Sequence, residues 1–86
     1  MTAEEALALV ADVKQGRTLE VKWEGPESHC FLVIRHDAER GFAGRFDEIP
    51  YDVLTPWPET TTRTWSEEEL VDLLASLPNG TAELTT

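Results

Sequence analysis

Apolar residues near the N-terminus recur with the period of a helix, at Ala6, Leu7, Val10 and Val13. Thr2 stands at the N-cap position with Glu5 three residues later, which is the spacing of a capping box. We therefore expect a helix over residues 3–15, ended by Gly16 in a left-handed cap conformation.

From Thr18 the apolar period changes to two. Leu19, Val21 and Trp23 alternate with charged residues, a pattern that predicts a strand with one buried face. Residues 29–35 are apolar through their centre and predict a central strand, whereas residues 42–46 predict a third, short one. The β-branched residues of 60–65 favour a fourth strand at an edge of the sheet.

Prolines mark the segment before that fourth strand, and a second capping box marks the start of a second helix. Pro50, Pro56 and Pro58 remove backbone donors, so residues 47–59 predict a loop or a single helical turn. Ser66 and Glu69 form a second capping box. A stripe of leucines follows at helical spacing, at positions 70, 73, 74 and 77.

These elements predict an α+β fold of two layers. The expected order is helix, three or four antiparallel strands and helix, with both helices packed on one face of the sheet. Residues 1–80 are expected to form a single domain, and residues 81–86 a flexible C-terminal tail because they carry little apolar content.

Composition narrows the environment of the chain. The 86 residues carry a formal net charge of −10 and a single cysteine, and no apolar stretch is long enough to span a membrane. A lone cysteine forms no intrachain disulfide and fits a reducing compartment, so we expect a cytoplasmic protein. The negative charge disfavours direct binding to nucleic acid or to an anionic membrane.

The residues able to carry catalysis or bind a metal are few. His29 and Cys30 are neighbours in a predicted strand, so their side chains point to opposite faces and do not form a nucleophile and base pair. Cys30 reads as a small buried hydrophobe. We expect no enzyme, cofactor or metal; a minor alternative is a metal protein that uses Cys30, His36 and Asp37.

The acidity has two interpretations, solubility alone or recognition of a basic protein surface. For recognition, the expected contacts are acidic and aromatic residues of the proline-rich region, at Asp47, Glu48, Tyr51, Asp52, Trp57 and Glu59. An extreme form is an inhibitor or nucleic-acid mimic. The alternative from another class is a homodimer paired through an edge strand, at residues 60–65 or 42–46.

Overall fold

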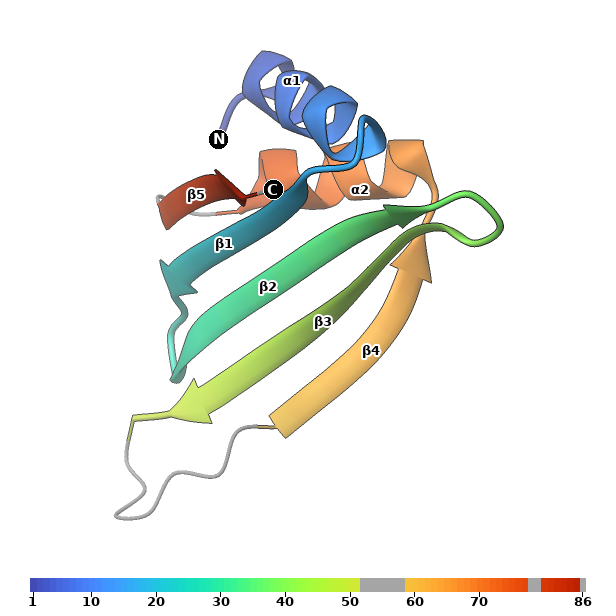
Figure 1. Cartoon of the computed structure of the whole chain (residues 1–86). Coiled ribbons are helices and arrows are strands. Elements are labelled where there is room, and N and C mark those ends of the chain that lie inside the picture. Colours follow the sequence, from blue (N-terminus) through green and yellow to red (C-terminus); the bar gives the residue numbers. More distant parts are fainter. Residues whose placement is uncertain (52–58, 78–79, 86) are drawn as a thin grey trace.

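The chain forms one antiparallel sheet and two helices, which confirms the expected α+β class (Figure 1). The computed structural model describes residues 1–51, 59–77 and 80–85. In chain order the elements are α1 (Ala3–Lys14), β1 (Thr18–Glu24), β2 (Ser28–Asp37), β3 (Gly41–Pro50), β4 (Glu59–Trp65), α2 (Glu67–Ser76) and β5 (Gly80–Thr85).

Both helices begin at the caps that the sequence predicts. The Thr2 hydroxyl accepts a hydrogen bond from the Glu5 amide of α1. At α2 the capping box is complete, because the Glu69 amide donates to the Ser66 hydroxyl and the Ser66 amide donates to the Glu69 carboxylate. Gly16 follows α1 with a φ of 105°, a backbone conformation that favours glycine at a helix end.

The strand order of the sheet is β4-β3-β2-β1-β5. Strands β1 to β4 are consecutive neighbours, so residues 60–65 lie in an edge strand as expected. The prediction that residues 42–46 offer a second free edge was wrong, because β3 is paired on both sides, with β2 and β4. It is also longer than expected and ends at Pro50, where a missing backbone donor is tolerated.

The expected flexible tail was also a wrong prediction. Residues Gly80–Thr85 form β5, which pairs with β1 from Trp23↔Gly80 to Thr18↔Thr85. Pairing of this kind satisfies backbone groups that β1 would otherwise expose at the edge of the sheet. The low apolar content of the segment therefore does not decide its structure.

The core is built from both helices and one face of the sheet. Residues opposite one another in the register share a face, so Leu19, Ile34 and Gly44 lie on the same side, which we call the core face. Its buried side chains join those of the helices in one cluster, formed by Ala6, Val10, Val13, Leu19, Val21, Leu32, Ile34, Phe42, Trp65, Leu70 and Leu74. Leu7 belongs to the apolar pattern that predicts the first helix, but its side chain is 55% exposed.

The helices do not cover the full length of the strands. In Figure 1 both helices lie near the start of β1 and the end of β4, whereas the opposite ends of β1, β2 and β3 extend beyond them. Accordingly Trp23 and Phe46, on the core face toward those ends, are half-buried, whereas Leu19 and Phe42 are buried. The uncovered part of the core face is therefore where side chains remain accessible.

Candidate functional site

Among the residues predicted to bind a partner, those whose side chains the structure describes do not all lie on one face of the sheet. Asp47 and Glu48 are adjacent in β3, so their side chains point to opposite faces of the sheet. Glu59 begins β4 opposite Glu48 in the register, and its side chain lies outside the described part of the structure. Asp52 and Trp57 also fall outside the described residues.

Asp47 is occupied by contacts within the sheet. It is only 9% exposed, and its carboxylate accepts hydrogen bonds from Arg45 Nε at 3.1 Å and from the Thr60 hydroxyl at 2.6 Å. Arg45 Nη2 lies 3.0 Å from the same carboxylate. Because a carboxylate with these partners is already satisfied, Asp47 ties β3 to β4 and offers little to a partner protein.

Tyr51 belongs to a polar cluster at the end of the β1–β2 hairpin. Its hydroxyl lies 2.7 Å from Glu24 Oε2, to which it donates, and 2.8 Å from the Gly25 carbonyl oxygen. His29 Nδ1 lies 2.6 Å from the same Glu24 oxygen, and the His29 and Tyr51 rings meet edge to face at 4.6 Å. Glu24 thus joins the end of β3 to β1 and β2.

In this cluster a carboxylate orients a histidine, an arrangement that also occurs in catalytic sites. A histidine held by a carboxylate can act as a general base. A nucleophile is missing beside His29 within residues 1–51, because the side chains of Ser28 and Cys30 lie on the other face of β2 and contact one another at 3.7 Å. Cys30 is 6% exposed, which confirms the buried role expected for it. The cluster of Glu24, His29 and Tyr51 therefore fastens the end of β3 to the β1–β2 hairpin, and we call it the clasp.

The contacts within the clasp change the pKa of Glu24 and the pKa of Tyr51 in opposite directions. The hydrogen bond from Tyr51 lowers the pKa of Glu24, and the neighbouring His29 acts in the same direction. Reciprocally, the hydrogen bond to Glu24 raises the pKa of Tyr51 to about 12, because ionising the phenol would place a second negative charge beside the carboxylate.

Tyr51 is the single tyrosine of the chain, so its ionisation can be followed by phenolate absorbance. We expect a midpoint at about 12 in the folded protein. Since this pKa is raised on folding, the bond stabilises the fold below the ordinary value of about 10 and its contribution is lost as the pH rises through the folded value.

Two glutamate variants test the origin of that shift. Glu24→Gln should bring the midpoint back toward about 10, the ordinary tyrosine value. Glu27→Gln removes a neighbouring exposed carboxylate and should leave the midpoint unchanged. A midpoint near the ordinary value in the wild-type chain, with its circular dichroism still native at that pH, would contradict the clasp.

An apolar groove occupies the uncovered part of the core face. It has a volume of about 290 Å³, and we call it the aromatic groove; its lining residues are Trp23, Leu32, Phe46, Thr61, Arg63, Trp65 and Leu73. The Trp23 and Phe46 rings stack across β2 with centroids 5.7 Å apart. The Arg63 guanidinium lies over the Trp65 ring, 5.0 Å from its centroid. Half-buried aromatic side chains of this kind are typical anchors in protein interfaces.

Acidic residues border the groove on two sides. Glu48 is half-buried on the core face, two residues after Phe46 in β3. Glu69 and Asp72 are exposed on α2, and a shallow hollow beside the groove is lined by both of them together with Arg63, Trp65 and Leu73. Arg63 lies 3.8 Å from Glu69, so its charge is already partly matched. The surroundings of the groove therefore favour a positively charged ligand.

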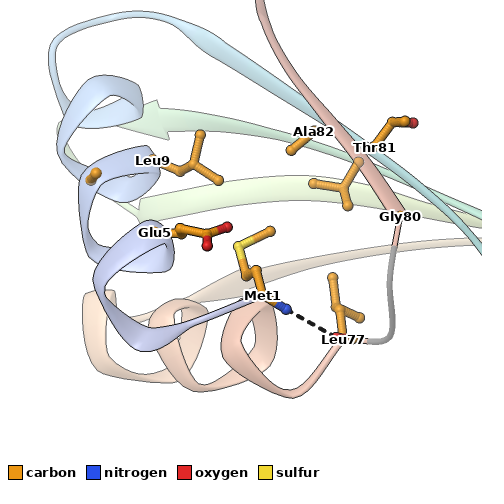
Figure 2. A pocket seen from close by; sticks show the side chains of 9 residues that line it. Met1, Glu5, Leu9, Leu77, Gly80, Thr81 and Ala82 are labelled. Carbon is orange, nitrogen blue, oxygen red and sulfur yellow. Dashed lines mark hydrogen bonds between the residues drawn. The ribbon is translucent and has the colours of Figure 1, made fainter.

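A second hollow of about 490 Å³ lies between α1, the end of α2 and β5 (Figure 2). Its walls combine Leu9 and Leu77 with the small residues Gly80 and Ala82. The amino group of Met1 donates to the Leu77 carbonyl at 3.2 Å beside it, as the dashed line in Figure 2 marks. It lacks the aromatic side chains of the groove, and the Met1 amino group beside it is already paired.

The two stacked aromatic residues of the groove were missed in the sequence because both looked like ordinary core. Trp23 and Phe46 stand at apolar positions of their strands, and nothing local shows that the helices stop short of them. The register of the sheet shows that both residues lie beyond the helices: Trp23 is opposite Cys30 and Phe46 is opposite Leu32, toward the extended ends of the strands. Aromatic residues near strand ends were the available signal.

Other kinds of site receive no support from the described residues. Within residues 1–51, 59–77 and 80–85, groups of three or more His, Cys, Asp or Glu side chains placed to hold a metal ion are absent. In the same ranges there is no helix of the length and apolarity that a membrane crossing requires. Comparisons with protein-family models, with curated proteins and with solved structures found no match to this chain.

Proposed function

We propose that this chain is a non-enzymatic protein-binding module that docks on a basic surface of its partner through the aromatic groove. The observation that carries the proposal is the stacked, half-buried pair of Trp23 and Phe46 on the uncovered part of the core face. An apolar surface left beside polar ones is typical of an interaction site.

The layering of the fold supports this location. In the proposed arrangement the two helices form a single layer on the core face, and they are too short to cover the ends of the longer strands. With 12 residues, α1 is about 18 Å long, and with 10 residues, α2 is about 15 Å long, whereas the 10 residues of β2 extend about 33 Å. A partner segment would cover the part of the core face that the helices leave open.

Charge supports the class of partner. The formal net charge is −10, and Glu48, Glu69 and Asp72 lie around the groove. Such a surface speeds encounter with a positively charged segment, while burial of an apolar side chain in the groove holds the complex. The contact surface proposed here replaces the expected one around Asp47, which is turned toward Arg45 and Thr60. We propose a reducing compartment such as the cytoplasm as its environment.

A display library of twelve-residue peptides, selected on the immobilised chain, tests the proposal. We expect enriched sequences to contain lysine or arginine together with an apolar residue. Their affinity should fall by about tenfold or more between roughly 0.05 and 0.5 M salt, because screening removes the long-range attraction. Peptides that bind equally well at both salt concentrations would contradict the electrostatic part.

Two variants of the edge strand locate the contact. Thr61 lines the groove and Thr62 is its neighbour on the other face, and both are exposed. Thr61→Tyr fills the groove and should weaken binding by about tenfold, equivalent to roughly 1.4 kcal/mol. Thr62→Tyr adds the same side chain to the opposite face and should change affinity by less than about twofold. Equal effects from the two variants would remove the groove as the site.

A further inference from the structure

The edge strand β4 has a regular backbone and, among the described strands, one side without a paired neighbour. It pairs only with β3 among the described strands, in an uninterrupted register from Phe42↔Trp65 to Glu48↔Glu59. The five consecutive residues 60–64 are all exposed. Because alternate backbone groups of an edge strand point away from its neighbour, β4 presents a row of N–H and C=O groups to solvent.

This edge has few of the features that usually prevent strand pairing; the charged side chain of Arg63 on the core face is one of them. Natural edges are blunted by proline, by lysine, by bulges or by very short strands. The sequence of β4 is Glu-Thr-Thr-Thr-Arg-Thr-Trp, which has neither proline nor lysine and is rich in β-branched residues. Its pairing with β3 runs over seven consecutive residue pairs without a bulge. The strand is therefore competent to accept another strand.

The edge and the groove are parts of one surface. Thr61 and Arg63 of β4 line the aromatic groove, and Trp65 forms its wall at the end of the strand. A strand added about 4.8 Å from β4 would place every second side chain on the core face, next to Thr61 and Arg63. The other edge strand, β5, has no residue in this groove.

We propose that the partner contributes an extended basic segment that pairs with β4 as an additional strand and places one apolar side chain in the aromatic groove. This inference rests on the proposed function and specifies its binding mode. Main-chain hydrogen bonds to β4 supply a sequence-independent part of the affinity, and the groove supplies selectivity. At the start of α2, one residue after β4, the exposed acid Glu68 adds attraction for lysine or arginine at one end of the segment; its neighbour Glu67 is already paired with Lys14 at 3.3 Å.

Charge also separates this occupant from a second copy of the chain. Two copies would bring together molecules that each carry a net charge of −10, whereas a basic segment neutralises the same surface. Pairing of β4 with its own copy thus works against long-range repulsion. Sedimentation at micromolar concentration should give a monomer, and a dimer that Thr61→Tyr dissociates would show that the edge is occupied by a second copy and overturn the inference.

Backbone N-methylation of a selected peptide tests strand addition directly. Successive N–H groups of a strand point to opposite sides, so only alternate residues of the peptide can donate to β4. Two peptides of identical sequence are made, one methylated at odd positions and the other at even positions. One of them should lose binding by at least about tenfold and the other should remain within about twofold of the parent peptide.

The outcomes separate the inference from the function on which it rests. If both methylated peptides bind like the parent while Thr61→Tyr still weakens binding, the groove recognises side chains without strand addition, and the inference is overturned while the proposed function stands. If both lose binding equally, the alternation that strand addition requires is absent. If selection enriches no peptide sensitive to Thr61→Tyr, the proposed function itself fails.

Discussion

Replacing Gly44 by alanine is expected to lower the free energy of unfolding by about 3 kcal/mol, at the upper end of the usual cost of overpacking a core. A Cβ atom at this position would lie 2.5 Å from the Val33 carbonyl oxygen and 2.8 Å from Cζ3 of Trp65. The carbonyl belongs to the paired backbone of β2 and cannot move aside without loss of the ladder. Alanine would therefore displace either β2 or the Trp65 ring.

The sign of this prediction is opposite to the general effect of the substitution. Glycine in a strand is normally the weaker residue, and alanine gains about 0.4–1 kcal/mol by restricting the unfolded chain. Here the missing side chain makes room for Trp65, which is 6% exposed and closes the core at the end of β4. Urea denaturation should show the midpoint falling by about 1–3 M, given a slope of roughly 1–3 kcal/mol per molar.

Ala43→Val is the matched control for Gly44→Ala. Ala43 is adjacent in β3, and its side chain lies on the opposite face, in a hollow lined by Val33 and Arg45. Added methyl groups meet open space there, so stability should change by less than about 0.5 kcal/mol. A Gly44→Ala chain with an unchanged or higher midpoint would show that Trp65 does not pack over this position.

Removing residues 80–86 is expected to lower the free energy of unfolding by about 2–3 kcal/mol. The lost contributions are the ladder between β5 and β1 and the packing of half-buried Leu84 against the core. Burial of a leucine side chain contributes roughly 1.5–3 kcal/mol and sets the scale of this loss, because the backbone entropy of the ordered residues largely offsets the hydrogen bonds of the ladder. Thermal and urea unfolding of the truncated and full chains would measure the difference.

Point substitutions in β5 distinguish a paired strand from a flexible tail. Leu84→Ala should account for much of the loss, whereas Glu83→Gln on the other face should have an effect below about 0.5 kcal/mol. Amide hydrogen exchange gives an independent reading, because ladder amides of β5 should be protected in the full chain. A truncated chain as stable as the full chain would restore the flexible tail that the composition suggests.

In the proposed binding surface the acidic residues and the aromatic residues contribute different parts of the affinity. A groove of about 290 Å³ accepts one large side chain, which by itself gives limited affinity. In the proposed binding mode, main-chain pairing along β4 and attraction by the exposed acids Glu68 and Asp72 would extend that contact over a longer segment. The same surface on a neutral protein would bind more slowly and with less preference for basic segments.

The position of Asp47 shows how tertiary structure changes the meaning of an acidic residue. In the sequence it belongs to a negatively charged stretch beside Pro50, where exposure and recognition are the natural expectation. In the sheet it is held by Arg45 from its own strand and by Thr60 from the next strand. A carboxylate directed inward and paired with a guanidinium contributes to the register of β3 and β4 instead of to a partner.

The structural features that can be predicted from the amino-acid sequence alone depend on residues close together in the chain. The caps at Thr2 and Ser66, the alternation from Leu19 to Trp23 and the buried state of Cys30 all follow from interactions between residues a few positions apart or from side-chain polarity. Even β5 carries a weak alternation, with Ala82 and Leu84 on one face, but two apolar residues do not outweigh the turn-forming composition around them.

The pairing of the strands and the uncovered part of the core face depend on contacts between distant parts of the chain. The hydrogen bond from Thr85 to Thr18 joins residues 67 positions apart, and no local preference encodes such a contact. The aromatic groove likewise exists because two short helices meet strands longer than themselves, which leaves Trp23 and Phe46 uncovered. Long-range pairing and incomplete coverage depend on the combined lengths of all elements, so they emerge only when the whole chain is assembled.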